Sequence, residues 1–142
     1  MRCWIGSLLA GMILTTPNVW SDVAVVVSNH SVLGALGRSE IMDIYTGRLL
    51  TLPNNEIPMP MDLRGTQPLR EAFYHALTGK PLAQINSYWA QLLFSGQATP
   101  PRILPDTHAM LQAVRQNASA IGFLPVQEVT TDVHVLFVLK TP

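Results

Sequence analysis

Residues 61–70, Met-Asp-Leu-Arg-Gly-Thr-Gln-Pro-Leu-Arg, combine groups that bind small anions. A predicted strand ends here and a predicted helix begins, so Arg64, Arg70 and the Thr66 hydroxyl lie around one turn. The first turn of a helix has backbone N–H groups without intrahelical partners and a partial positive charge, and both attract anions. On spacing alone a second interpretation stays open, in which Thr66 caps the helix and both arginines face solvent.

Other chemistry finds little support among the side chains. The four histidines form no His-x-x-x-His or His-Glu-x-x-His pattern, and the single cysteine excludes a structural zinc site of cysteine ligands. The sequence contains no Gly-x-Ser-x-Gly nucleophile motif and no glycine-rich nucleotide loop, so we expect no enzyme, no metal and no cofactor. Nine Lys+Arg balance nine Asp+Glu, and this lack of basic excess argues against a nucleic-acid partner.

Residues 1–21 predict a secretory signal peptide. Arg2 supplies one positive charge, residues 4–16 form an uncharged run of 13, and the small residue Ser21 follows a helix-breaking Pro17. This order is typical of a leader that is cleaved after Ser21. Residues 22–142 would then be a single domain of 121 residues (142 less 21), with no further segment long enough to span a membrane.

Strand-like and helix-like segments alternate along residues 22–142. The valine-rich run at residues 23–27 is typical of a strand that is buried on both faces. Helical spacing of apolar residues predicts helices at residues 39–45, 67–77 and 81–95, and a further helix from residue 106 or 107. Strands are also expected at residues 57–63, 120–124 and 133–139, with an extended crossing at residues 99–102. The alternation predicts a three-layer α/β domain with a mostly parallel or mixed sheet.

Turn and capping residues set the expected boundaries. Ser39 and Thr66 are candidate N-caps of the first two helices, and Asp106 or Thr107 is the candidate for the last. Glycines at positions 47, 79 and 96 are expected to end the first three helices. The prolines at positions 58 and 60 are expected to place the strand at residues 57–63 at an edge or rim of the sheet.

Three segments, in the same order along the chain, resemble the substrate-binding proteins of phosphate ABC transporters, the PstS-like branch of the periplasmic binding proteins. The first is the strand at residues 23–27 with Ser-Glu-Ile-Met-Asp-Ile-Tyr-Thr-Gly-Arg at 39–48. The second is residues 58–73, and the third is Ala-Ile-Gly-Phe-Leu at 120–124. The resemblance implies a type 2 periplasmic-binding-protein-like lobe, an α/β fold with a mixed sheet flanked by helices, and a periplasmic location.

The second segment is similar to the part of that family that holds a tetrahedral oxyanion on loop N–H groups, hydroxyls and an arginine. The resemblance therefore implies a phosphate or oxyanion site at Arg64, Gly65, Thr66 and Gln67, which Arg70 supplements one helical turn later. Where the family has Gly-Ser-Gly-Thr, this sequence has Gly-Thr-Gln-Pro, and a proline has no N–H to donate. Full members have two lobes, so a single open lobe is expected to bind the anion weakly.

Two functions are compatible with these observations. The first is a small periplasmic solute-binding protein that holds phosphate or a similar oxyanion for a transporter permease or a sensor. The second is an interaction module, derived from a binding protein, that has lost its ligand and contacts another envelope protein. The cluster of Arg64, Thr66 and Arg70 favours the first, and the short length with the altered Gly-Thr-Gln-Pro motif favours the second.

Overall fold

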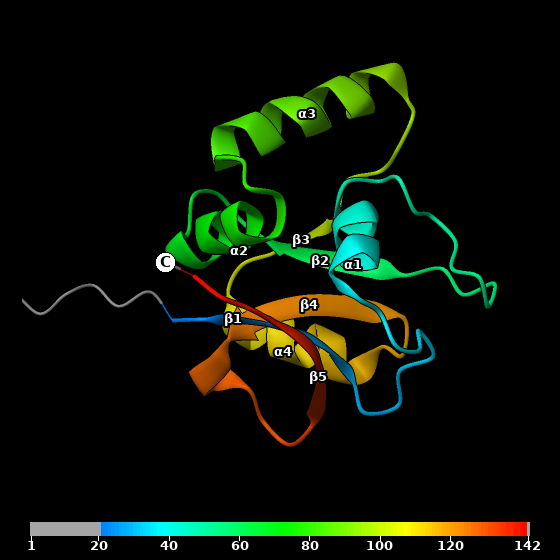
Figure 1. Ribbon diagram of the computed structural model, residues 1–142, viewed down its shortest axis with the longest axis vertical. Helices are drawn as coiled ribbons and strands as arrows, with labels where there is room; N and C mark the ends of the chain where they lie inside the picture. Colours follow the sequence, from blue (N-terminus) through cyan, green and yellow to red (C-terminus); the bar gives the residue numbers. More distant parts are fainter. Residues whose placement is uncertain (1–20, 142) are drawn as a thin grey trace, which may run out of the picture.

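The computed structural model describes residues 21–141 as five strands, four helices and one 3-10 turn (Figure 1). In chain order the elements are β1 (Val23–Ser28), α1 (Arg38–Tyr45), β2 (Met59–Leu63), α2 (Pro68–Thr78), α3 (Leu82–Ser95), β3 (Arg102–Leu104), α4 (Thr107–Gln116), β4 (Ala120–Pro125), η1 (Val126–Glu128) and β5 (Val133–Leu139). The expected signal peptide lies outside the described residues apart from Ser21. Among residues 21–141, no helix combines the length and the apolar character that crossing a bilayer requires.

The five strands form one mixed sheet in the order β3-β2-β4-β1-β5. β1 runs antiparallel to β4 on one side and to β5 on the other, whereas β2 runs parallel to both β3 and β4. The carboxyl ends of β2, β3 and β4 therefore lie at one edge of the sheet. Open α/β sheets bind ligands at the carboxyl ends of their parallel strands, so this edge positions the candidate site.

Helices cover both faces of the sheet (Figure 1). Gly122 of β4 faces α4, because a Cβ at this position would lie 2.7 Å from the Met110 sulfur and 2.8 Å from a Val114 methyl group. The next residue, Phe123, points to the opposite face and stacks on Phe73 of α2 with 3.9 Å between ring centroids. The expected three-layer α/β arrangement is confirmed.

The centre of the sheet forms the core. All six residues of β1 are buried, as its run of valines predicts. The sheet and helices bury a cluster of aromatic rings in which Tyr45 of α1 meets Phe73 edge to face, at 4.8 Å between centroids. Such pairs stabilise a core beyond their area burial, by about 0.5–1.5 kcal/mol each. β1 and β4 thus give the neighbouring parallel strand β2 a rigid support.

α2 packs on the sheet and α3 packs on the outer side of α2 (Figure 1). α3 buries Leu82, Ile85 and Trp89 along one side. The expected glycine ends of both helices are confirmed, because Gly79 and Gly96 are C-caps with φ of 74° and 70°. These left-handed values favour glycine, which has no Cβ to clash with the backbone.

Two expected helix caps are wrong. Ser39 lies within α1, whose N-cap is Gly37, and the Gly37 N–H donates to the Glu40 carboxylate at 3.1 Å. The N-cap of α2 is Gln67 rather than Thr66, and no side chain accepts a capping bond there. The N-terminal turn of α2 is therefore left without a side-chain cap.

The prolines predict that β2 lies at an edge or rim of the sheet, and the edge alternative is wrong. β2 lies between β3 and β4, but in the described sheet Met59 and Pro60 pair with β4, and β3 joins from Met61 onward. Pro60, which lacks an N–H, thus lies where β2 has a single neighbour. The expected extended crossing ends at Arg102, which instead begins β3 and extends the sheet beyond β2.

Candidate anion-binding site

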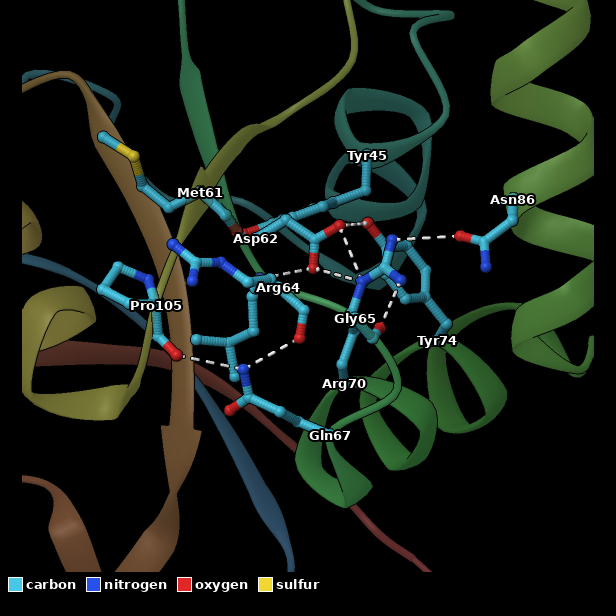
Figure 2. A network of polar contacts seen from close by, with 11 residues as sticks. Tyr45, Met61, Asp62, Arg64, Gly65, Gln67, Arg70, Tyr74, Asn86 and Pro105 are labelled. Carbon is cyan, nitrogen blue, oxygen red and sulfur yellow. Dashed lines mark hydrogen bonds and ion pairs between the residues drawn. The ribbon is translucent and has the colours of Figure 1, made fainter.

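The β2–α2 loop, residues 64–67, lies at the carboxyl edge of the parallel strands (Figure 2). The Arg64 N–H donates to the Leu104 carbonyl at 2.9 Å and so extends the pairing of β2 with β3. The Gln67 side-chain amide donates to the Pro105 carbonyl at 3.1 Å. These two bonds hold the loop against the segment that leads into α4, while residues 64–66 stay exposed.

Arg70, in the first turn of α2, points inward and binds three parts of the molecule (Figure 2). Its Nε donates to both carboxylate oxygens of Asp62, at 3.0 and 3.1 Å. Nη1 donates to the Gly65 carbonyl at 2.8 Å, and Nη2 donates to Asn86 Oδ1 of α3 at 3.2 Å. The Arg70 and Asp62 side chains are only 10% and 2% exposed, so the ion pair is internal.

The buried Asp62 carboxylate has donors on both oxygens. Besides Arg70, it accepts from the Leu63 N–H at 2.7 Å and from the Tyr74 hydroxyl at 2.8 Å. A buried charge is tolerated when an opposite charge and further hydrogen bonds compensate its lost hydration. The Arg70 guanidinium also lies 5.5 Å from the centroid of the Tyr74 ring. β2, α2 and the loop between them are therefore held by one polar network.

Two tyrosines on this network remain donors. Burial, and then the negative charge of Asp62, raise the pKa of Tyr74 well above its usual value. The same two causes raise the pKa of Tyr45, whose hydroxyl donates toward the Met61 carbonyl at 2.9 Å and the Ile121 carbonyl at 3.0 Å. Both hydroxyls therefore stay protonated in the physiological pH range and continue to donate to the oxygens beneath the loop.

The loop has free donors, while most of its carbonyls are occupied. The Arg64 carbonyl accepts from the Gln67 side chain at 2.8 Å, and the Gly65 carbonyl accepts from Arg70. Within residues 21–141, by contrast, the N–H groups of Gly65, Thr66 and Gln67 have no hydrogen-bond partner, and neither do the Thr66 hydroxyl and the Arg64 guanidinium. A loop with three of its four backbone carbonyls occupied and several donors free attracts an anion rather than a cation.

The two arginines do not converge. Figure 2 shows the Arg64 guanidinium on the side of the loop facing Pro105, away from the Asp62–Arg70 pair. Arg64 is exposed, whereas Arg70 is buried among protein oxygens. An anion near the loop therefore meets Arg64 directly, and it could reach Arg70 only by displacing Asp62, Gly65 or Asn86.

A second helix, α4, begins at the same edge, but its N-terminus is occupied. The Asp106 carboxylate accepts from the Ala109 N–H at 2.8 Å, which confirms the expected cap. The Thr107 hydroxyl donates to the Glu128 carboxylate at 3.1 Å. Two carboxylates at this position repel an anion, so of these two helix starts α2 is the one open to it. In the described part of the chain, no group of three or more His, Cys, Asp or Glu side chains could hold a metal ion.

Sequence reasoning missed the partners of Arg70. Asp62 had a signal, because an acidic residue within an apolar strand needs a cationic partner once the strand is buried. Tyr74 lies four residues after Arg70 and so shares its helix face. Asn86 lies on α3, and no local pattern connects it with the loop.

Comparison with solved structures identifies the fold. No family model and no curated protein matches the chain. An ABC-type phosphate transport receptor from Vibrio cholerae superposes with a TM-score of 0.63 at 16% identity, over 82% of this chain and 45% of the receptor. This chain has the fold of one lobe of such a receptor.

Two further structures support the same assignment. A Clostridium perfringens protein, described as a phosphate ABC transporter substrate-binding protein and solved with bound phosphate, matches with a TM-score of 0.64 at 17% identity, over 82% of this chain and 44% of that one. A Planctomyces limnophilus DSM 3776 protein, described as a possible phosphate-binding protein, matches with a TM-score of 0.59 at 10% identity, over 82% of this chain and 40% of that one. The chain spans less than half the length of each match, and the likeness at these identities is one of fold.

Proposed function

We propose that the chain binds phosphate or a similar tetrahedral oxyanion at the β2–α2 loop. The observation that carries this proposal is the polarity of the loop, in which the Arg64 and Gly65 carbonyls accept hydrogen bonds from side chains while the N–H groups of residues 65–67 are free. The backbone of Gly65, Thr66 and Gln67 supplies donors, the Thr66 hydroxyl adds one, and Arg64 supplies the charge. The fold match, which includes a protein solved with bound phosphate, supports the same class of ligand.

Arg70 has a positioning role in this proposal rather than the ligand role that its sequence position suggests. Its bond to the Gly65 carbonyl orients the loop, and its ion pair with Asp62 fixes α2 against β2. Because each guanidinium nitrogen already donates to a protein oxygen, the anion gains little from Arg70 directly.

Binding is expected to be weak. The loop is exposed, and charge-assisted bonds to an anion in water are worth far less than in an enclosed site of low dielectric. A dissociation constant of about 1 mM corresponds to about 4 kcal/mol, which a few N–H groups and one arginine can supply. Delivery of the anion to a transporter permease or a sensor in the periplasm belongs to the same proposal.

A titration of the purified protein with phosphate and with sulfate tests the proposal. Phosphate at one hundred times its dissociation constant should add about 2.7 kcal/mol to the free energy of unfolding, which raises the melting temperature. Isothermal calorimetry gives the constant independently. Chloride at matched ionic strength is the control for general salt effects. If the melting temperature does not change even at the highest phosphate concentration that stays in solution, the site is excluded.

Substitution of Arg64 separates this loop from other sites. Arg64→Ala removes a charge-assisted bond worth about 1.5–3 kcal/mol, so phosphate should bind roughly ten- to a hundredfold more weakly. Arg48→Ala is the matched control, because Arg48 is also an exposed arginine but lies after α1, away from the loop. Equal losses in the two variants would show non-specific attraction and contradict the proposal.

The second candidate function, an interaction module in the cell envelope, rests on a different observation. The region around α3 exposes a large apolar surface that is separate from the loop. The two functions are compatible, because the apolar groove beside the end of α3 is lined by the start of β2, whereas the loop follows the end of β2.

A further inference from the structure

The peptide unit between Gly65 and Thr66 is held in one orientation. The Gly65 carbonyl accepts from Arg70 Nη1 at 2.8 Å. In a trans peptide the carbonyl and the following N–H point in opposite directions, and residues 21–141 contain no cis peptide bond. The bond from Arg70 therefore turns the Thr66 N–H away from the buried guanidinium.

The direction of this bond is set by the other contacts of the Arg70 side chain (Figure 2). A guanidinium is a rigid planar fork, so two fixed nitrogens, together with the covalent bond to Cδ, also fix the third. Nε is fixed by the Asp62 carboxylate, and Nη2 is fixed by Asn86 Oδ1 at 3.2 Å. The place of Nη1, and with it the Gly65 carbonyl, thus depends on both Asp62 and Asn86.

These two anchors differ in what else they do. Asp62 is buried, balances the charge of Arg70 and also accepts from Leu63 and Tyr74, so the fold itself depends on it. Asn86 is exposed and neutral, so it balances no charge. Without its side chain a water molecule can accept from Nη2, which satisfies the donor but does not hold it in one direction. The contribution of Asn86 is therefore one of orientation.

α3 holds Asn86 firmly enough for this task. The helix packs on α2, and the neighbouring residue Ile85 is buried, so the backbone at Asn86 has a fixed place beside Arg70. We propose that Asn86 is a positioning residue of the anion site, which holds the Arg70 guanidinium so that the Gly65–Thr66 peptide presents its N–H to the ligand. This role rests on the proposed function of the loop. It makes α3 a part of the site, although α3 does not touch the anion.

Calorimetric titration of Asn86→Ala with inorganic phosphate tests this role. The dissociation constant should rise about three- to tenfold, the range that the loss of one well-directed hydrogen bond produces. Gln84→Ala is the matched control, because Gln84 is also an exposed amide of α3 but its side chain makes no hydrogen bond within residues 21–141. It should bind phosphate as wild type does. The midpoints of urea unfolding should be similar for the two variants, because each loses an exposed neutral side chain.

The NMR resonance of the Thr66 amide, measured without phosphate, reports the orientation of the peptide directly. Asn86→Ala should shift this resonance, whereas Gln84→Ala should leave it in place. Asn86→Asp retains an oxygen that accepts from Nη2, so its Thr66 resonance should stay close to that of wild type. Asn86→Asp is compared by this resonance alone, because its added negative charge weakens phosphate binding by itself.

The two measurements separate this role from the proposed function. If wild type binds phosphate and Asn86→Ala binds it equally well, the positioning role is overturned and the loop remains the site. Equal effects of Asn86→Ala and Gln84→Ala on affinity or on the Thr66 resonance also overturn it. A wild-type protein that does not bind phosphate contradicts the proposed function instead, and the Thr66 resonance then still decides whether Asn86 orients the peptide.

Discussion

Two helices begin side by side at the carboxyl edge of the sheet, and their first turns are prepared differently. α4 is capped by its own Asp106 carboxylate, with Glu128 close to Thr107. The N-cap of α2 is Gln67, whose side chain donates to the Arg64 and Pro105 carbonyls and leaves the helix N-terminus open. A helix N-terminus is thus available to an anion when no carboxylate of the chain caps it and when the neighbouring carbonyls already accept hydrogen bonds.

The largest effect is expected where the network that supports the open helix is broken. Asp62→Ala leaves the buried Arg70 charge without its partner, which should lower the free energy of unfolding by about 3–5 kcal/mol. Urea denaturation measures this loss. Asp132→Ala is the control, because Asp132 pairs with Arg115 at the surface and such a pair is worth under about 1 kcal/mol. A loss for Asp62→Ala as small as for Asp132→Ala would show that the network does not support the loop.

Most of the fold could be predicted from local patterns. The valines of β1, the glycine ends of α2 and α3, and the Asp106 cap each depend on a few neighbouring residues, and the structure confirms them. β3 was harder, because three residues become a strand only through parallel pairing with β2. The position of β2 likewise depends on which of its residues face β3, and the prolines alone could not show that.

The candidate site was predictable in its residue types but not in its geometry. The segment at residues 61–70 indicates donors near a helix start, and the structure places them there. The sequence does not show that Arg70 turns inward, because that depends on Asp62 across the turn and on Asn86 of α3. The orientation of a long side chain follows from tertiary partners, so two arginines that look equivalent in the sequence differ in the fold.

The carboxylate cap of α4 provides the second test. Asp106→Ala removes the cap of α4 and should cost about 1 kcal/mol in thermal or urea unfolding. Asp106→Asn retains a capping oxygen without the charge and is the matched control. If stability is unaffected by Asp106→Ala, then the α4 N-terminus is not held by this carboxylate, and the contrast between the two helices fails.

A single substitution should give the N-terminus of α2 a carboxylate cap like that of α4. Gln67→Asp places a carboxylate at the N-cap of α2, as at α4, and should reduce phosphate affinity at least tenfold through repulsion and competition for the N–H groups. The free energy of unfolding should change by less than about 1 kcal/mol. Gln67→Asn is the neutral control and should retain more of the affinity in calorimetry. Undiminished binding by Gln67→Asp would argue against the loop as the site.

The smallest effect concerns a carboxylate that is paired at the surface. The Lys140 side chain at 3.0 Å and then the Thr141 N–H at 3.2 Å lower the pKa of Asp22 below its ordinary 3.8. Because the pKa of this carboxyl is lower in the folded than in the unfolded state, the ionised group stabilises the fold at pH values above the unfolded-state pKa. This contribution is lost as the pH falls through the folded-state pKa. Asp22→Asn should therefore slightly reduce melting temperature at neutral pH and have no effect in strong acid. A reduction that persists in acid would exclude this pair as the cause.

The same contact has a consequence for how the lobe can be built into larger proteins. Val23 pairs with Leu139 across neighbouring strands, and Asp22 binds both Lys140 and Thr141. The described polypeptide thus enters and leaves the domain at one place. Domains with adjacent entry and exit points tolerate circular permutation and insertion into a host loop, because two short connections carry them without strain. The lobe is therefore suited to insertion into other proteins.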